Sequence, residues 1–322
     1  MEDFFGLDRG PFVNHLPLCP YFWESVIYPL FEEKIIEETE CSVTKYNKFG
    51  ILVKEIKESS SMPQWIRFPV ETREDFENLL SRLDGTLAER YPENWEEIVN
   101  DKKAQGQPLG FAVPGFLGFG RSLMGIERFS LASYDDPNLI LDINRHALQF
   151  MKDISSRALN ELTIDFVTIW EDMCYKGGML VSPSFFYRFM APFYEEAVEW
   201  FHTMGVGTLL VDSDGNVNEL VSLLHEVGVD GLYPCEIRAG TDLSEIRKKY
   251  PDFIIVGGID KFALVEGTES IDLALQRAAE MVKQGGFIPT VDHRVPPEVS
   301  LSNYEYYITK RKELAESVFC GG

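Results

Sequence analysis

The sequence predicts a single α/β domain built as a TIM-type (β/α)8 barrel with a decorated N-terminal segment. Short segments that are apolar throughout alternate along the chain with amphipathic segments, a pattern typical of a parallel sheet covered by helices on both faces. The length of 322 residues agrees, because α/β barrels commonly exceed ~250 residues as one unit. The predicted strands are Gly110–Gly115, Asp165–Trp170, Thr208–Val211, Gly231–Tyr233, Phe253–Gly257 and Gly286–Val291.

The helices between these strands carry apolar residues at three- and four-residue spacing. Ser182 before Pro183 is a helix N-cap followed by proline at the first helical position. Gly285-Gly286 closes the last of these helices as a C-cap would. The predicted helices are Pro183–Met204, Val217–Val227, Asp242–Tyr250 and Ser270–Gln284.

The first hundred residues have a different pattern. Ser42–Lys57 predicts a hairpin, and Glu71–Leu83 and Pro92–Asn100 predict surface helices. No Ser/Gly-rich linker follows them, so we interpret residues 1–105 as a decoration of the barrel and residues 106–322 as its core βα repeats.

Composition excludes several classes of function. Thirty basic and fifty-two acidic residues give a net charge of −22, which would repel nucleic acid and anionic lipid. No apolar run approaches the ~18 residues of a membrane span, and no secretory signal is visible, so we expect a cytoplasmic protein. Five scattered cysteines without a CxxC pair indicate reduced thiols. Neither dinucleotide- nor P-loop spacing occurs in the glycine-rich stretch 115–125.

Acidic residues close five of the predicted strands, and parallel barrels carry their function at the carboxyl ends of strands. His293 also follows a predicted strand, unlike the other histidines. The residues at these ends are Glu171, Asp172, Asp212, Asp214, Glu236, Asp260, Asp292 and His293.

Three interpretations of these acids stay open. They could cap the following helices, and Asp260 fits this best. They could bind a metal, because Asp212 and Asp214 point the same way and Glu236 and His293 would complete an oxygen-rich ligand set. They could also perform metal-free acid–base chemistry, since crowding keeps at least one carboxyl protonated near neutral pH.

Aromatic residues near the same ends could form the wall of a substrate pocket. Trp170, Tyr175 and Tyr233 are the candidates, with Asp172 beside them, although core packing explains aromatic residues equally well. Cys235 is a possible soft ligand next to Glu236, and a buried inert thiol is at least as plausible.

Five segments together resemble the uroporphyrinogen decarboxylase-like superfamily, in order along nearly the whole chain from Phe4 onward. The resemblance implies a TIM barrel and one of two activities: decarboxylation in heme synthesis, or methyl transfer in corrinoid-dependent systems. The segments are Trp170–Gly178 (WEDMCYKGG), Val211–Asn216 (VDSDGN), Gly231–Glu236 (GLYPCE), Gly257–Lys261 (GGIDK) and Gly286–Pro297 (GFIPTVDHRVPP).

The residues favour the methyltransferase branch. The decarboxylases open with an arginine-bearing segment resembling RQAGR, whereas Arg9 is the only arginine in residues 1–48. A chain of charge −22 without that clamp is a poor receptor for a substrate with eight carboxylates.

In that branch a His-x-Cys pair and a further thiolate bind zinc. The resemblance implies that Asp212 and Asp214 replace the pair, that Glu236 matches an acid near the zinc, and that His293 falls near the last ligand. Carboxylates would make this a harder site for zinc or another divalent metal, suited to an ether donor, whose leaving oxygen the metal would polarise.

The sequence therefore predicts a methyltransferase that moves a methyl group from a small donor, such as an aromatic methyl ether, to the cobalt of a separate corrinoid protein. Asp212, Glu236 and His293 are its predicted catalytic residues. The alternatives are a decarboxylase-like activity and a non-catalytic ligand-binding barrel. Relatives usually carry the first barrel strand in an extra N-terminal stretch, so either the barrel is incomplete, or Val13–Leu18 supplies this strand, or the start is truncated.

Overall fold

A sheet of seven parallel strands forms the core of the computed structural model, which describes residues 15–18, 26–58 and 62–319. Every neighbouring pair in this sheet is parallel. In spatial order the strands are β1 (His15–Leu16), β6 (Gly110–Pro114), β7 (Phe166–Trp170), β10 (Thr208–Asp212), β11 (Gly231–Cys235), β12 (Ile254–Ile259) and β13 (Phe287–Val291).

All six predicted strands are thus confirmed as parallel neighbours in a TIM-type α/β fold. Within the described residues the sheet has seven strands, whereas the prediction has eight. Strands β1 and β13 are the two edges of this hydrogen-bonded sheet. The segment Val13–Leu18 does supply a strand, since residues 15–16 pair with β6; residues 13 and 14 lie outside the described part.

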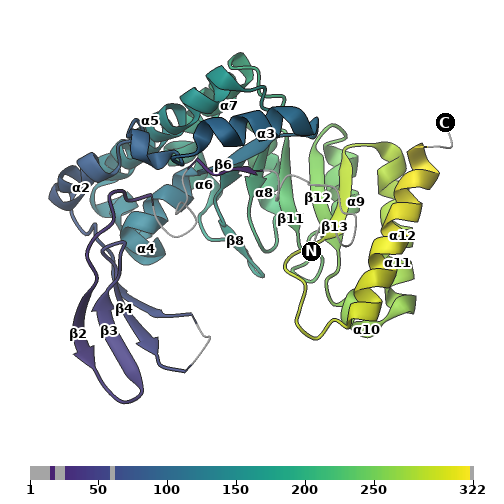
Figure 1. Cartoon of the computed structure of the whole chain (residues 1–322), viewed down its shortest axis with the longest axis horizontal. Coiled ribbons are helices and arrows are strands. Elements are labelled where there is room, and N and C mark those ends of the chain that lie inside the picture. The colour runs from purple at the N-terminus through teal and green to yellow at the C-terminus, as the bar shows by residue number, and fades with distance from the viewer. Residues whose placement is uncertain (1–14, 19–25, 59–61, 320–322) are drawn as a thin grey trace.

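Helices cover the outer face of the sheet (Figure 1). The predicted helix Pro183–Met204 consists of α6 (Pro183–Phe185), a π-helical turn η3 (Phe186–Met190) and α7 (Ala191–Thr203). Ser182 caps its start as predicted, accepting the N–H of Phe185 at 3.2 Å. The other predicted helices are α8 (Asn218–Glu226), α9 (Leu243–Lys249) and α11 (Thr268–Gln284), the last closed at Gly285 as predicted.

Three long helices lie outside the predicted set. They are α4 (Phe116–Asp135), α5 (Pro137–Glu161) and α12 (Leu301–Phe319), and a short α10 (Ala263–Glu266) precedes α11. Helix α4 is broken at Gly125, whose φ of 70° is unfavourable for other residues and where a Cβ would meet the ring of Phe68 at 2.5 Å.

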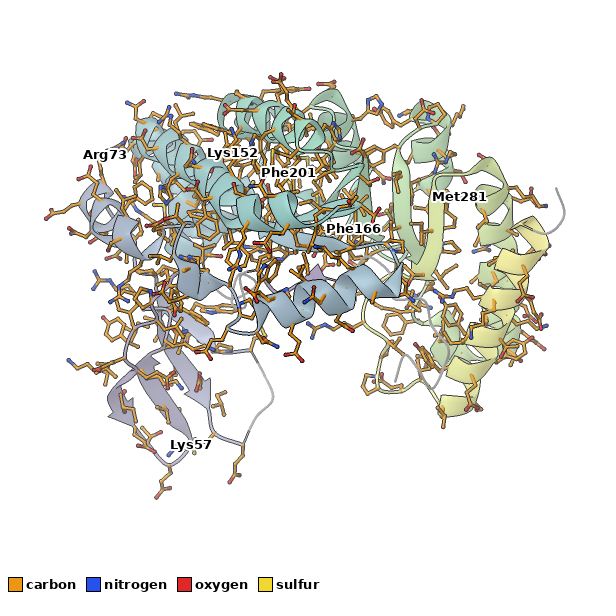
Figure 2. All side chains as sticks on the ribbon, turned by 45° about the horizontal axis from the view of Figure 1, so that its top comes forward. Lys57, Arg73, Lys152, Phe166, Phe201 and Met281 are labelled. Atoms are coloured by element: carbon orange, nitrogen blue, oxygen red, sulfur yellow. The ribbon has the colours of Figure 1, made fainter. Side chains whose placement is uncertain are left out.

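Alternation along the strands separates two apolar layers. Leu209 and Val211 pack toward the helices in the main core, which also contains Phe201 (Figure 2). Leu210 faces the other way and joins a cluster with residues of β11 and β12. Asp212 is two residues further along, so it shares the face of Leu210 and points into the barrel.

The N-terminal decoration contains a four-stranded antiparallel sheet that stands away from the barrel, on the same side as β8 (Figure 1), with Lys57 at its far end (Figure 2). The predicted hairpin is confirmed as β3 and β4. The helices are close to those predicted. The elements are β2 (Lys34–Glu38), β3 (Ser42–Tyr46), β4 (Leu52–Ile56), β5 (Gln64–Arg67), α2 (Arg73–Leu79), η1 (Leu80–Arg82), η2 (Ala88–Arg90) and α3 (Trp95–Gln105).

A two-stranded hairpin, β8 (Cys174–Tyr175) and β9 (Gly178–Met179), follows β7. None of the described helices combines the length and the apolar character that crossing a membrane requires.

Candidate functional site

The carboxyl ends of β7, β10, β11, β12 and β13 meet at one end of the barrel, and the predicted site residues lie there. Asp212 is the last residue of β10, Glu236 follows β11 directly, and His293 lies two residues beyond β13. The prediction that these three residues share one end of the barrel is confirmed.

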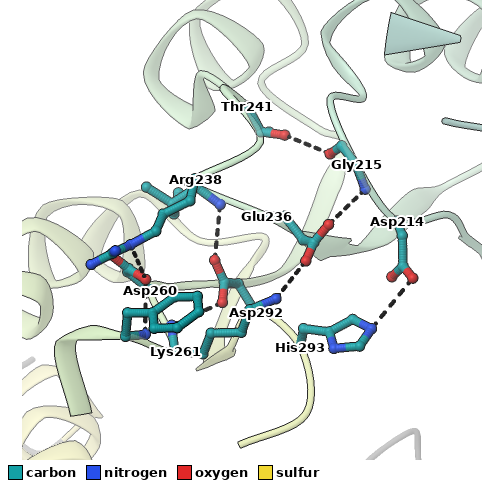
Figure 3. Close-up of polar contacts among 11 residues, drawn as sticks. Asp214, Gly215, Glu236, Arg238, Thr241, Asp260, Lys261, Asp292 and His293 are labelled. Atoms are coloured by element: carbon teal, nitrogen blue, oxygen red, sulfur yellow. Dashed lines mark hydrogen bonds and ion pairs between the residues drawn. The ribbon is translucent and has the colours of Figure 1, made fainter. Parts of the chain in front are cut away.

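Glu236 is held by two donors (Figure 3). Its Oε1 accepts from Lys261 Nζ at 2.7 Å, and its Oε2 accepts the backbone N–H of Gly215 at 2.8 Å. Both side chains of the ion pair are mostly buried, with 17% of Glu236 and 20% of Lys261 exposed. The carboxylate of Glu236 is therefore already neutralised by a lysine of the chain.

His293 pairs with Asp214 (Figure 3), with 3.3 Å between Nε2 and the nearer carboxylate oxygen. The hydrogen bond that His293 donates to Asp214 is the largest influence on the imidazole and raises its pKa. This pair consequently favours a protonated, cationic His293.

Asp212 has a different environment. It lies on the inner face of the barrel, where it retains some contact with solvent. Burial, followed by repulsion from Asp214 and Asp172, raises its pKa to about 8, and the charge of His293 and a hydrogen bond with Tyr233 oppose this only in part. Burial likewise raises the pKa of Tyr233, so Asp212 and Tyr233 both hold protons at neutral pH.

Arg121 of α4 adds a cation to the site near the carboxyl end of β7. Its guanidinium donates to the backbone oxygen of Asp172 at 2.7 Å and to the carboxylate at 3.1 Å, and it lies 4.9 Å from the centre of the Trp170 ring. Asp172 has a φ of 49°, which is uncommon for a residue with a side chain. Arg121 thus fixes a strained residue at the edge of the site.

Three of the acids accept backbone N–H groups. Of these, Asp260 lies at the start of the helix that follows it, as the capping interpretation predicts, whereas Glu171 binds an earlier helix and Asp292 binds two loops. Glu171 is fully buried and accepts the N–H groups of Phe116 at 2.7 Å and Gly118 at 2.8 Å, in the first turn of α4. Asp292 is also buried and accepts the N–H groups of Ile237 and Lys261, both at 2.9 Å. Asp260 accepts the N–H of Phe262 at 2.9 Å and pairs with Arg238.

The four predicted metal ligands do not fit a shared ion as they are placed. They divide into the pairs Glu236–Lys261 and Asp214–His293, with Asp212 on the inner face of the barrel. Across the described ranges, no three His, Cys, Asp or Glu side chains are grouped as a metal site would require. We therefore derive no chemical step through a bound metal.

The other predicted residues are distributed unevenly. Trp170 and Asp172 lie at the carboxyl end of β7, Tyr233 is buried in register with Asp212 on the neighbouring strand, and Tyr175 is 56% exposed on β8. Burial raises the pKa of Cys235 to about 12, which favours an inert thiol over a metal ligand.

Sequence analysis missed Lys261 and Arg121. Lys261 directly follows Asp260, one of the acids at the strand ends. Arg121 is the only charged residue in the glycine-rich stretch 115–125. A search of these segments for cations would have found both residues.

Ionisable groups gathered at the carboxyl ends of parallel strands are the arrangement found in α/β-barrel enzymes. The family model described as Uroporphyrinogen decarboxylase (URO-D) matches residues 57–314. The chain belongs to this family, which indicates an enzyme.

Solved structures add support for the fold. A methyltransferase from Methanosarcina mazei superposes with a TM-score of 0.59 at 16% identity, over 83% of this chain and 76% of that one. A Listeria monocytogenes protein assigned as a vitamin-B12 independent methionine synthase gives a TM-score of 0.40 at 13% identity, over 69% of this chain and 68% of that one. An Anoxybacillus α-amylase gives 0.38 at 10% identity, over 73% and 62%. The last two carry no argument, and no curated protein matches the chain.

Proposed function

We propose that this chain is the methyltransferase of a corrinoid-dependent system and takes a methyl group from a small ether, such as an aromatic methyl ether. The observation that carries the proposal is the placement of Asp212 at a strand end, facing into the barrel beside Tyr233 of the neighbouring strand. The likeness in fold to a methyltransferase agrees with it.

Ether demethylation needs a proton donor at this position. When the C–O bond breaks, the methyl group passes to the reduced cobalt of the partner's corrinoid, and the leaving oxygen keeps the electron pair of the bond. A protonated Asp212 would donate its proton to that oxygen, and Tyr233 would hydrogen-bond to the resulting carboxylate. The acid of pKa about 8 is protonated at neutral pH and can be reprotonated from solvent.

The remaining residues of the site would position the donor. Trp170 offers an aromatic surface at the mouth, and Arg121 holds Asp172 beside it. The pairs Asp214–His293 and Glu236–Lys261 lie beyond the ends of β10 to β13 (Figure 3). In this proposal His293 and Glu236 affect Asp212 through their charges and do not bind a metal ion.

The corrinoid protein would approach at the mouth of the barrel. The small sheet β2–β5 stands out on this side (Figure 1), and apolar side chains are exposed on it, among them Ile35 (58%) and Trp65 (48%). Apolar residues exposed in such number support a partner-dependent enzyme.

Decarboxylation of a polycarboxylate finds less support. Arg121 and Lys261 are engaged by Asp172 and Glu236, so these two cations do not offer an open clamp for substrate carboxylates. This agrees with the missing arginine segment in residues 1–48.

The test is a spectroscopic transfer assay. Purified protein is mixed with an aromatic methyl ether and cob(I)alamin, and the conversion of the reduced cobalt to methylcobalamin is followed by its absorbance. We expect turnover by the wild type and a loss of about 100-fold in Asp212→Asn, the range for removing a general acid. Asp252→Asn, an exposed acid before β12, is the control. No transfer with any methyl ether, or production of coproporphyrinogen from uroporphyrinogen, would overturn the proposal.

A further inference from the structure

Two of the predicted metal ligands, Glu236 and Asp214, each have a basic side chain of the same chain beside them. Lys261 Nζ lies 2.7 Å from Glu236, and His293 Nε2 lies 3.3 Å from Asp214. The neighbouring Asp172 has Arg121 at 3.1 Å. Carboxylates crowded together are stable only with a cation, a proton or several hydrogen-bond donors.

The two loops that carry Glu236 and Lys261 are joined to each other through hydrogen bonds of their backbone. One buried carboxylate, Asp292, accepts the N–H of Lys261 through one oxygen and the N–H of Ile237 through the other, both at 2.9 Å. Ile237 follows Glu236 in the chain, so Asp292 holds the two loops that carry the ion pair at a fixed separation (Figure 3). Only 1% of Asp292 is exposed.

A third contact fixes the other side of Glu236. The N–H of Gly215 donates to Oε2 at 2.8 Å, and Gly215 has a φ of 87°, with the backbone of Tyr175 only 2.7 Å from where a Cβ would lie. Both oxygens of Glu236 are therefore occupied, and a metal ion would have to displace the ammonium of Lys261 and withstand its repulsion.

We infer that Lys261 takes the place of a divalent cation in this site and excludes metal from the set Asp214, Glu236 and His293. The inference uses the site of the proposed function, but it concerns the identity of the cation and not the reaction. Lys261 is then the residue that determines whether Glu236 is neutralised by an ammonium group or by a metal ion.

The experiment measures zinc affinity without turnover. Wild type and Lys261→Met are titrated with zinc against a chromophoric chelator at pH 7.5, and zinc retained after dialysis is measured by elemental analysis. Methionine removes the charge and keeps an unbranched side chain. We expect weak binding by the wild type and an affinity about ten-fold higher or more in Lys261→Met. The double variant Lys261→Met/Glu236→Gln should lose this gain.

Two controls separate a site effect from a change in surface charge. Lys283→Met removes another lysine from an ion pair, with Glu280 at 3.0 Å on the exposed surface of α11, and should leave zinc affinity unchanged. Lys261→Arg keeps the positive charge and should bind zinc as weakly as the wild type.

Wild-type protein that retains one zinc per chain through dialysis would overturn the inference, as would equal affinities in wild type and Lys261→Met. If Lys261→Met does not fold, the inference is tested by the zinc that the wild type retains after dialysis and by the zinc affinity of Lys261→Gln. The outcome is independent of methyl transfer. A chain without activity could still show the ten-fold gain, and an active chain could fail to show it.

Discussion

The raised pKa of Asp212 predicts an unusual dependence of stability on pH. Asp212 has an ordinary pKa of 3.8 in the unfolded chain and a pKa of about 8 in the folded protein. Between pH 5 and pH 7 the folded state therefore binds one more proton at this position than the unfolded state. Because stability falls with pH wherever the folded state binds more protons, the stability that Asp212 contributes is present at low pH and is lost as the pH rises toward 8.

The magnitude follows from the difference of one proton. One proton corresponds to about 1.4 kcal/mol for each pH unit, so the free energy of unfolding should fall by about 3 kcal/mol from pH 5 to pH 7 through Asp212 alone. Screening by solvent at the mouth acts by lowering the folded-state pKa, and a pKa near 7 sets a lower limit of about 2 kcal/mol. The slope of the free energy of unfolding against pH does not depend on the precise folded-state pKa of Asp212, provided that this pKa lies above 7.

Asp212→Asn is the perturbation that isolates this contribution. Asparagine has the shape of the protonated acid and stays neutral, so the stability of the variant relative to the wild type should rise by about 2 to 3 kcal/mol between pH 5 and pH 7. Urea unfolding at pH 5, 6 and 7 and constant ionic strength gives both curves, and subtracting them cancels other titrating groups. Asp252→Asn controls for the loss of one exposed carboxylate. Parallel curves for wild type and Asp212→Asn would refute the reasoning.

Three further substitutions test other parts of the site. Glu171→Gln turns one acceptor oxygen into an amide that faces an N–H of the first turn of α4, and should lower the free energy of unfolding by about 2 kcal/mol in urea melts; an unchanged melt would contradict the capping role. Arg121→Met should lower the free energy of unfolding by less than about 1 kcal/mol, because the carboxylate of Asp172 is 40% exposed. It should nevertheless reduce the rate of methyl transfer about ten-fold in the cobalamin assay, and a rate equal to that of the wild type would exclude a positioning role for Arg121. Gly215→Ala combines a φ of 87° with a steric clash and should destabilise the protein by more than about 1 kcal/mol, whereas Gly205→Ala, with open space at its Cβ, measures the cost of a positive φ alone.

Much of the fold could be predicted because burial determines the pattern of the strands. Segments such as Thr208–Asp212 are apolar on both faces, and their identification required no knowledge of their neighbours. The long helices α4 and α5 were missed, since α4 begins in a glycine-rich stretch that suggests a loop. Gly115 and Gly118 of that stretch are explained by Glu171: a Cβ on Gly115 would lie 2.2 Å from its carboxyl carbon, and its oxygen accepts the N–H of Gly118.

The residues of the site could be predicted, but their roles could not. The rule that function lies at the carboxyl ends of strands located Asp212, Glu236 and His293 correctly. The partners of these residues come from other strands, at distances along the chain that no local pattern encodes. Lys261, for example, is 25 residues from the carboxylate that it neutralises.

The same sequence feature, an acid that closes a strand, has three different physical outcomes in this barrel. Where the adjacent loop presents backbone N–H groups, the buried acid accepts them: Glu171 caps α4, and Asp292 joins the loops after β11 and β12. Where that loop presents a cation, as Lys261 does for Glu236, the acid becomes half of an ion pair. Asp212 has other carboxylates as its main charged neighbours, and among the ion pairs of the described residues none includes it. A proton is the remaining means of neutralising its charge, and a proton held in this way is available for transfer to a substrate.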